Sequence, residues 1–425
     1  MAVERAQSLA VIGPTQSGKT TALAVPAILA WEGPVLAASV KSDLVRSTLG
    51  WRQQAGRVWC FDPAGSTGLR SDTWSPVASA RTWAGARRVA ADLTEVARGE
   101  GTTADGEFWY ATAAKLLAPL LLAAAVGGRD MVDVVRWVDT QEIGEVLDLL
   151  EGAGVPEALT AVRATWQREE RQRSSVYTTA ETVLEPFAEP PAPGPAPGRP
   201  IVPEELVGGS HTLYLCAPAH DQRRLRGLFT AVVKSVLEAA FARVARSGRP
   251  LEPPLLVVLD EAANIAPVGE LDALAATCAG HGVQLLTVWQ DLSQVIARYG
   301  PRASTVVNNH RAKLFLPGIA DPATLDQASQ LVGDEEVLAD SVTFDPTGGR
   351  STTAAPLHRR LLPPDALRRM PPGTGVLVYG SLPPVRLRLR PWWDDPQLAV
   401  RGSAGPSDEL RQAGGGVGGP AKPAG

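Results

Sequence analysis

The residues with the clearest chemical potential form the segment Gly13-Pro14-Thr15-Gln16-Ser17-Gly18-Lys19-Thr20-Thr21. It matches the phosphate-loop pattern G-x-x-x-x-G-K-[ST] at every required position. In such a loop the backbone N–H groups point inward at an anion, and the following helix adds the positive end of its dipole. We expect Lys19 to reach the β- and γ-phosphates of a nucleotide and the Thr20 hydroxyl to ligate Mg²⁺. An apolar run before the segment and a helical pattern after it disfavour the alternative of a chance glycine-rich turn.

Two adjacent carboxylates, Asp260 and Glu261, end a second apolar run, Leu255–Leu259. Unbroken apolar runs are typical of strands buried in a parallel sheet, and ligands bind at the carboxyl ends of such strands. We expect Asp260 to hold Mg²⁺ and Glu261 to orient and deprotonate the attacking water. An Asp-Glu pair suits an ATPase that turns over repeatedly. The alternative, a strand ending in a solvated acidic turn, is weakened by the phosphate loop upstream.

A third apolar run, Leu285–Trp289, ends in Gln290. If its strand lies beside the strand that ends at Asp260, Gln290 would contact the γ-phosphate. It would then join Lys19 and Glu261 as a catalytic residue and report the state of the nucleotide along its strand. The alternative role for Gln290 is to cap the next helix.

The elements that position these residues alternate between strands and helices, which predicts an α/β fold with a parallel sheet. Between two such regions lie Ala- and Leu-rich segments with helical spacing. The chain is therefore expected to comprise a first part of a nucleotide-binding domain (1–82), an all-helical insertion (83–189), a Pro-rich linker (190–200), the second part of the nucleotide-binding domain (201–400) and a disordered tail (401–425).

Composition is that of an ordinary globular protein: 425 residues, 44% hydrophobic, 20% charged, with a net charge of −4. Such a charge argues against a surface coated uniformly for nucleic acid, but it leaves room for a local basic groove. The three cysteines lie far apart and are expected to be buried thiols in a reducing compartment. The apolar stretch 116–126 is expected to be too short to cross a bilayer, and no signal peptide is evident, which predicts a cytoplasmic chain.

Several further segments resemble the TraG/TraD-type coupling proteins of conjugation and type IV secretion, especially the actinobacterial ones. The segments that carry the resemblance, besides the motifs above, are Ser39–Asp43, Phe61–Pro63, Phe108-Trp109 and Trp289–Asp291. The likeness extends from Leu9 to about Trp393. It implies a RecA-like P-loop NTPase with a mainly parallel central sheet, into which an all-alpha domain is inserted.

The resemblance also implies a homo-hexameric ring ATPase that uses ATP and Mg²⁺. Such a ring would recruit single-stranded DNA bound to a relaxase, or a secreted protein substrate, and feed it to a secretion channel at the inner face of the cell membrane. Two alternatives stay open. One is an FtsK-like pump of double-stranded DNA, although such pumps usually lack the helical insertion. The other is a docking adaptor that binds ATP and hydrolyses it poorly.

The sequence departs from the pattern of coupling proteins in two places. Those proteins usually carry N-terminal membrane helices, so the anchor is expected to come from another chain or to be missing from this sequence. They often have an arginine in the turn before the strand that ends in Gln, whereas the turn Thr277–Gly282 has none. Three arginines downstream either replace it or are ordinary surface residues: Arg298, Arg302 and Arg311.

Two other charged groups have open roles. Lys41 and Asp43 follow a strand end beside the phosphate loop, and they form either part of the nucleotide pocket or a surface ion pair. The cluster Arg223–Arg226 either contacts DNA phosphates or forms a solvated helix face.

Overall fold

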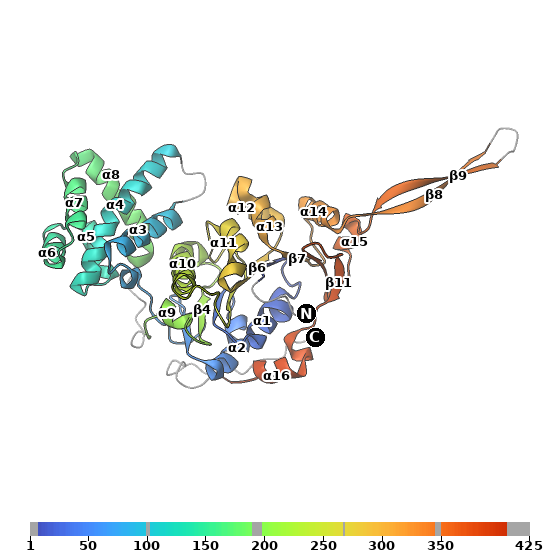
Figure 1. The fold of residues 1–425 in the computed structure, drawn as a ribbon, viewed down its shortest axis with the longest axis horizontal. Helices are drawn as coiled ribbons and strands as arrows, with labels where there is room; N and C mark the ends of the chain where they lie inside the picture. The colour runs from blue at the N-terminus through green and yellow to red at the C-terminus, as the bar shows by residue number, and fades with distance from the viewer. Residues whose placement is uncertain (1–6, 99–102, 189–197, 267, 345–349, 406–425) are drawn as a thin grey trace.

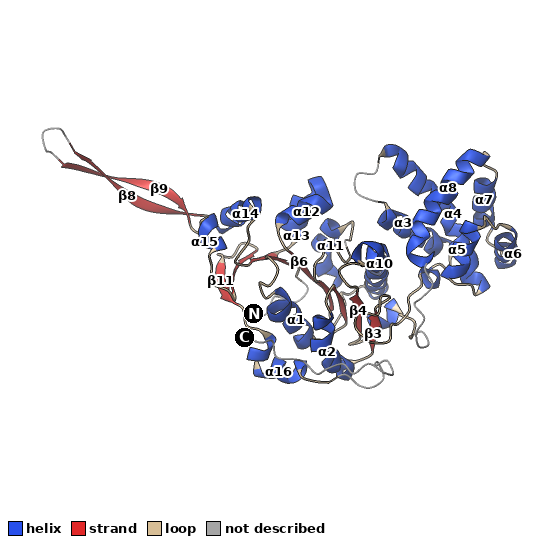
Figure 2. Ribbon diagram, turned by 180° about the vertical axis from the view of Figure 1, so that it is seen from behind, coloured by secondary structure: helices blue, strands red, loops and turns tan. Residues whose placement is uncertain are grey.

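The computed structural model describes residues 7–98, 103–188, 198–266, 268–344 and 350–405. These residues form three parts: a sheet domain, a helical body beside it, and a long β-hairpin on the opposite side (Figure 1). Figure 2 shows the same arrangement from behind, with strands confined to the sheet domain and the hairpin.

Nine strands form the sheet of the sheet domain. Their bounds are β1 (Leu9–Ile12), β2 (Val35–Ser39), β3 (Val58–Phe61), β4 (Thr212–Cys216), β5 (Leu255–Leu259), β6 (Val283–Trp289), β7 (Ala312–Phe315), β10 (Thr374–Tyr379) and β11 (Val385–Arg388). The spatial order is β11-β10-β7-β1-β6-β5-β2-β4-β3. The strands from β7 to β3 run parallel, and β10 and β11 form an antiparallel edge. This mainly parallel sheet confirms the predicted α/β fold class.

Helices cover both faces of the sheet, which explains why its central strands are mainly apolar. The helices are α1 (Val25–Ala30), α2 (Ser42–Ala55), α9 (Pro203–Leu206), α10 (Gln222–Ser247), α11 (Leu271–Thr277), α12 (Leu292–Tyr299), α13 (Ala303–Asn309), α14 (Pro322–Val332), α15 (Pro364–Arg368) and α16 (Pro396–Gly402). One face packs against α1 and α2 and the other against α10 to α14. All three cysteines are buried free thiols, as predicted.

The helical body is an independent core of six helices. They are α3 (Trp83–Ala97), α4 (Ala104–Gly127), α5 (Met131–Asp139), α6 (Gly144–Ala153), α7 (Pro156–Trp166) and α8 (Glu170–Ala188). The expectation about the stretch 116–126 was wrong in one respect, because α4 continues through Pro119 and is long and apolar enough to cross a membrane by length and composition. Its leucines instead lie inside the body: Leu116, Leu117, Leu120 and Leu121 are buried against the neighbouring helices.

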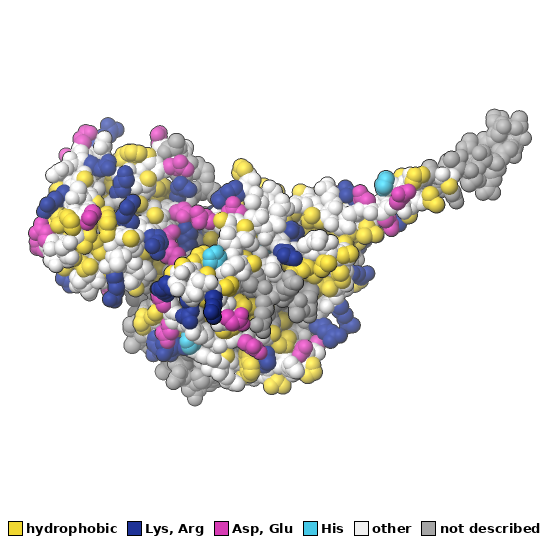
Figure 3. All heavy atoms as spheres, viewed as in Figure 1, with side chains coloured by type: hydrophobic (Ala, Val, Ile, Leu, Met, Phe, Trp, Pro, Cys, Tyr) yellow, Lys and Arg dark blue, Asp and Glu magenta, His cyan; other side chains and the backbone are white. Residues whose placement is uncertain are grey.

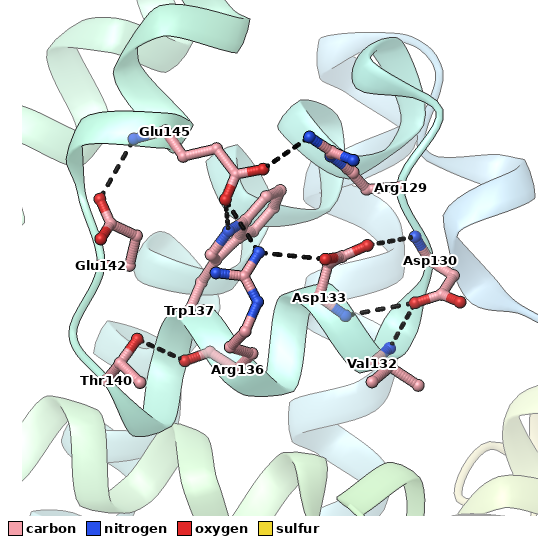
Figure 4. Close-up of polar contacts among 9 residues, drawn as sticks. All are labelled: Arg129, Asp130, Val132, Asp133, Arg136, Trp137, Thr140, Glu142 and Glu145. Atoms are coloured by element: carbon pink, nitrogen blue, oxygen red, sulfur yellow. Dashed lines mark hydrogen bonds and ion pairs between the residues drawn. The ribbon is translucent and has the colours of Figure 1, made fainter.

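Polar contacts at the surface of the helical body tie its successive helices together (Figure 4). The Glu145 carboxylate of α6 accepts hydrogen bonds from Arg136 and from the Trp137 indole of α5, both at 2.8 Å. It also pairs at 3.0 Å with Arg129, which lies just after α4. These contacts hold the Arg136 pKa above and the Glu145 pKa below the usual ranges, chiefly through the hydrogen bond between the two.

The hairpin was not predicted from the sequence. Its strands, β8 (Asp334–Phe344) and β9 (Arg350–Arg360), pair with each other and project away from the sheet domain (Figure 1). Ion pairs between Glu335 and Arg359 at 2.6 Å and between Asp334 and Arg360 at 3.3 Å hold its root. Hydrophobic side chains gather around this root and the neighbouring edge of the sheet domain (Figure 3).

The boundaries of the sequence-predicted regions can be compared with the structure at two points. Much of the linker, residues 190–197, lies outside the described residues, but Pro200 forms a bridge with Thr73, next to the start of the helical body. Residues 401 and 402, which were assigned to a disordered tail, belong to helix α16 (Pro396–Gly402). Arg401 lies in α16, donates a hydrogen bond to the Leu29 carbonyl at 2.8 Å and stacks over Trp51. Residues 406–425 lie outside the described residues.

Candidate nucleotide-binding site

The sheet brings the predicted site residues to one edge. Strand β6 lies between β1 and β5, with Ile12 opposite Trp289 and Leu259 opposite Thr287. The segments that follow these three strands therefore emerge side by side. They are the phosphate loop 13–20, the pair Asp260-Glu261, and Gln290. As predicted, the strand that ends before Gln290 lies beside the strand that ends before Asp260.

The loop 13–20 has the backbone that a phosphate loop requires. Gly13 passes so close to Leu316 that a Cβ on Gly13 would lie 2.7 Å from the Leu316 Cβ, so a side chain there would displace the neighbouring strand. Gln16 and Gly18 have φ values of 64° and 84°, and such left-handed residues turn successive N–H groups toward one side. The Ser17 hydroxyl donates to the Pro14 carbonyl at 2.7 Å and braces the turn.

Lys19 lies against the loop. Its ammonium donates to the carbonyls of Gly13 and Pro14, the latter at 2.5 Å. Burial lowers the Lys19 pKa, while the charges of Asp260 and Glu261 oppose that shift. Phosphate oxygens are stronger acceptors for an ammonium than neutral carbonyls. The geometry thus holds a cation where a phosphate would be bound.

The chain after the loop begins with a π-helical turn, Thr20–Ala24, and becomes regular only at α1. Pro26 lies in the first turn of α1, a position that proline's fixed φ suits.

Asp260 is the centre of a hydroxyl cluster suited to Mg²⁺. Its Oδ2 accepts hydrogen bonds from Thr20 Oγ1 at 3.1 Å and from Ser39 Oγ at 3.2 Å. Burial raises the Asp260 pKa, and these two hydrogen bonds oppose the rise. Mg²⁺ takes hard oxygen ligands and usually binds through one or two protein groups, phosphates and waters. Thr20 and Asp260 fit that requirement, and Ser39 is a third oxygen that sequence analysis did not assign to the site.

Glu261 has an unusual backbone. Its φ of 70° lies in the left-handed region, which a glutamate adopts only where the surroundings hold it. The surrounding contacts are backbone hydrogen bonds from Ala262 to Val288 at 3.0 Å and from Asn264 to the Glu261 carbonyl at 2.9 Å. The Asn264 side chain also donates to Glu261 Oε2 at 3.5 Å. Sequence analysis missed Asn264, because an Asn five residues after a strand end carries no specific signal.

The capping alternative for Gln290 does not hold. Asp291 is the residue that caps α12, since its carboxylate accepts the Gln294 N–H at 2.9 Å. Gln290 contributes only its backbone N–H, which donates to the Gln294 side chain at 3.0 Å. The Gln290 side chain therefore has no capping task in this turn.

Other charged residues singled out in the sequence have contacts within the chain. Arg302 pairs with Asp272 at 3.3 Å and Arg311 stacks over the Tyr379 ring, which favours the surface interpretation of both. Arg226 donates to the Asn264 carbonyl at 3.3 Å and is therefore not simply solvated.

Asp62, in the quoted segment Phe61–Pro63, has a structural role. It is buried and accepts hydrogen bonds from the backbone and the hydroxyl of Thr67 at 2.6 and 2.7 Å. These bonds fix the turn that follows β3. Lys41, in the other quoted segment, lies near enough to Lys19 for its charge to help lower the Lys19 pKa.

Comparisons with known proteins agree with this geometry. A family model described as "Type IV secretory system Conjugative DNA transfer" matches residues 4–408. The conjugal transfer protein TraG of Escherichia coli is 26% identical over 396 residues, which cover 84% of this chain and 61% of that protein. Protein VirD4 of Agrobacterium fabrum is 25% identical over 421 residues, which cover 91% of this chain and 59% of that protein. The chain thus spans about three fifths of the length of these relatives.

Solved structures of the bacterial conjugative coupling protein TrwB have the same fold. The unbound form, TrwBdeltaN70, superposes with a TM-score of 0.68 at 21% identity and covers 90% of this chain and 84% of its own. A complex of TrwB with the ATP analogue ADPNP gives a TM-score of 0.68 at 19% identity, over 91% of this chain and 86% of that one. The RecA-like P-loop NTPase fold is thereby confirmed. Because the family model covers nearly the whole chain, this protein belongs to the conjugative DNA transfer family of type IV secretory systems.

Proposed function

We propose that this chain is the nucleotide-hydrolysing part of a coupling protein, an ATP-driven motor that delivers a substrate to a type IV secretion or conjugation channel. The observation that carries the proposal is the convergence of three strand ends, which brings together the phosphate loop, Asp260-Glu261 and Gln290. TrwB has been solved with ADPNP, with ADP and Mg²⁺, and with the GTP analogue GDPNP. Its fold supports nucleotide binding by this chain.

In the proposed reaction each residue has a defined task. The backbone of residues 13–18 binds the phosphates, Lys19 neutralises the β- and γ-phosphates, and Thr21 continues the loop into the helix. Thr20 and Asp260 hold Mg²⁺, which when bound offsets negative charge on the phosphates. Glu261 accepts a proton from the attacking water, which becomes the new oxygen of the released phosphate. Gln290 contacts the γ-phosphate.

The wider assembly is part of the proposal. The substrate is single-stranded DNA carried with a relaxase, or a secreted protein, and the helical body faces it. The motor is a homo-hexamer in the cytoplasm, held at the inner face of the membrane by an N-terminal anchor or by another chain. The family name and the TraG and VirD4 relatives support this assignment.

The direct test is the ATPase rate of the purified chain with and without single-stranded DNA, with GTP and double-stranded DNA as comparisons. DNA-stimulated hydrolysis should be lost in Lys19→Ala and should fall by about 10²–10⁴-fold in Glu261→Gln, the usual contribution of a general base. Gel filtration with ATP should show the chain moving from monomer to ring. Nucleotide binding with negligible turnover in every condition would contradict the motor.

One observation favours a second candidate, a docking adaptor that binds ATP and hydrolyses it poorly. The turn Thr277–Gly282 has no arginine, and the nearby Arg302 and Arg311 contact groups of the same chain. An arginine that reaches a neighbour's phosphate contributes about 10³–10⁵-fold to rate in other P-loop enzymes. A tight ATP affinity with a rate unaffected by DNA or by assembly would support the adaptor.

A further inference from the structure

A short set of contacts joins Glu261 to the start of helix α10. The Asn264 side chain donates from Nδ2 to Glu261 Oε2 at 3.5 Å. The Asn264 carbonyl in turn accepts a hydrogen bond from Arg226 Nε, in the second turn of α10, at 3.3 Å. Asn264 therefore lies between the carboxylate proposed to activate water and a charged residue of a long core helix.

The backbone around Asn264 is fixed on both sides. Ala262 donates to Val288 of β6 at 3.0 Å, and the Asn264 N–H donates to the Glu261 carbonyl at 2.9 Å. Beyond it, Ile265 and Ala266 are fully buried in the core. Glu261 is held in its left-handed conformation, with φ of 70°, by this turn. This turn therefore holds the Asn264 side-chain amide in one orientation toward the Glu261 carboxylate.

A hydrogen bond to one carboxylate oxygen has a specific consequence for a general base. The last torsion of a glutamate is broad, so a carboxylate without a fixed partner samples many orientations. Donation to Oε2 fixes the plane of the carboxylate and leaves Oε1 to accept a proton. Catalysis depends on that orientation, since a misplacement of about 1 Å can lower a rate about a hundredfold.

We propose that Asn264 is a positioning residue for Glu261, and that Arg226 keeps Asn264 in place from α10. This proposal rests on the proposed function, hydrolysis of ATP with Glu261 as the base. It gives Arg226 a task other than the two considered from the sequence, which were contact with DNA phosphates and solvation.

The experiment compares kcat and KM for ATP in the chain of residues 1–425 and in its Asn264→Ala variant. The expected result is a fall in kcat of about ten- to a hundredfold with KM and the affinity for a non-hydrolysable analogue unchanged, because orientation of the base acts on the transition state. Asn264→Asp, which keeps the shape but replaces the donor by a negative charge beside Glu261, should lower kcat at least as much as Asn264→Ala. Asn264→Gln, which keeps an amide donor, should retain more activity than Asn264→Asp.

The matched control for Asn264 is Asn309→Ala. Asn309 is also half-buried and its side-chain amide also donates a hydrogen bond, but to the main-chain carbonyl of Asp272, at 2.9 Å, and it lies away from the three strand ends. Its removal should leave kcat unchanged. In the Glu261→Gln background, Asn264→Ala should cause no further loss, since the group that it positions is already disabled.

Arg226→Ala should lower kcat in the same direction and should not add fully to Asn264→Ala. The control is Arg243→Ala, an exposed arginine of the same helix. Unchanged kcat in Asn264→Ala with an active wild-type chain, or an equal loss in Asn309→Ala, would overturn the positioning role and leave the motor intact. A wild-type chain with no hydrolysis in any condition would overturn both proposals together.

Discussion

Thr20 and Asp260 are 240 positions apart in the chain, yet the Thr20 hydroxyl lies 3.1 Å from Asp260 Oδ2. Two long segments, including the whole helical body, separate them in sequence. The contact exists because β1 and β5 are held on either side of β6 in one parallel sheet. The two oxygens that we propose as Mg²⁺ ligands are thus already adjacent in the folded chain.

Because the Thr20 and Asp260 oxygens are adjacent, we expect Thr20 to contribute to the part of the ATP affinity that depends on Mg²⁺. Thr20→Ala removes one oxygen ligand and should lower the affinity for ATP about tenfold when Mg²⁺ is present, which is about 1.4 kcal/mol. With EDTA the two chains should bind ATP equally. Thr20→Ser, which keeps the hydroxyl, is the control. Titration calorimetry measures all three, and an equal benefit from Mg²⁺ in Thr20→Ala would contradict the assignment.

Replacement of Arg52 should lower the free energy of unfolding by a large amount. It is fully buried, and its guanidinium donates to Thr212 Oγ1 at 2.7 Å and to the carbonyls of Trp31, Gly33 and Ser210. Burial lowers the Arg52 pKa. Arg52→Met should leave those acceptors unsatisfied and lower the free energy of unfolding by about 3–5 kcal/mol.

Urea unfolding measures the effect of Arg52→Met, and Arg46→Met, at an exposed position of the same helix, is its control. The control should lie within about 0.5 kcal/mol of the wild type, as is usual for surface substitutions. A similar loss in both variants would mean that the effect comes from α2 in general and not from the bonds of Arg52.

His310 predicts a loss of stability in acid. It is fully buried, its Nδ1 donates to the Val306 carbonyl at 2.7 Å, and its Nε2 accepts from Thr287 at 3.0 Å. Burial lowers the His310 pKa from 6.5 to about 4. The unfolded chain binds a proton at His310 at a higher pH than the folded chain does. The free energy of unfolding is therefore unaffected by this proton above pH 6.5 and decreases as the pH falls from 6.5 to about 4. The expected loss is about 3 kcal/mol.

Unfolding of the wild type and of His310→Asn between pH 7 and 4 tests this prediction. The variant should be less stable at pH 7, and its free energy of unfolding should vary less with pH across that window. Equal pH slopes for the two chains would show that His310 is not held neutral in the folded state.

Glu238, at the contact between α10 and the helical body, should make the free energy of unfolding depend on pH in the opposite direction. Burial, followed by the neighbouring Asp92, raises the Glu238 pKa to about 7, while Arg88 and Lys234 oppose the rise. The folded chain therefore holds a proton that the unfolded chain loses near pH 4.5, and this stabilisation declines as pH rises from about 4.5 to about 7. Since the side chain is about a third exposed (35%), solvent screening reduces the expected effect to about 1 kcal/mol.

Glu238→Gln should therefore be more stable than the wild type at pH 8 and should show a flatter profile between pH 5 and 8. Thermal unfolding at a series of pH values measures this. Glu157→Gln, at an exposed position of α7, is the control and should reproduce the wild-type slope. A stabilisation that does not change between pH 5 and 8 would exclude the proton-holding role of Glu238.

The strands of the sheet and the residues of the proposed site could be predicted from the sequence where a single physical requirement determines the residue types of a segment. Strands buried on both faces appear as apolar runs, as in Leu255–Leu259, and residues that we propose to bind ligand follow their ends, as Asp260 does. The order of the strands in the sheet was assumed only for β5 and β6, and that assumption is confirmed. The phosphate-loop pattern needs glycine at two fixed places, which is why the sequence assigns the proposed loop to definite residues.

Features that depend on tertiary contacts could not be predicted. Arg52 and His310 are buried polar residues whose partners come from distant segments, and local pattern assigns such residues to the surface. Ser39 and Asn264 reach the site only through the pairing of β2, β5 and β6. The hairpin strands, DEEVLADSVTF and RSTTAAPLHRR, contain no long unbroken apolar run, so their segments lack the burial signal of the central strands.

The bridge between Thr73 and Pro200 shows that the helical body is an insertion whose two ends lie side by side on the sheet domain. The chain leaves the sheet domain and returns to it at two adjacent residues, which are already linked by hydrogen bonds from Thr73 to Arg199 at 3.0 Å and from Ile201 to Thr73 at 2.8 Å. A link of a few residues could close that gap, because the two ends require no repositioning. The insertion could thus be excised or exchanged between relatives as a module, while the strands that carry the phosphate loop and Asp260 keep their pairing.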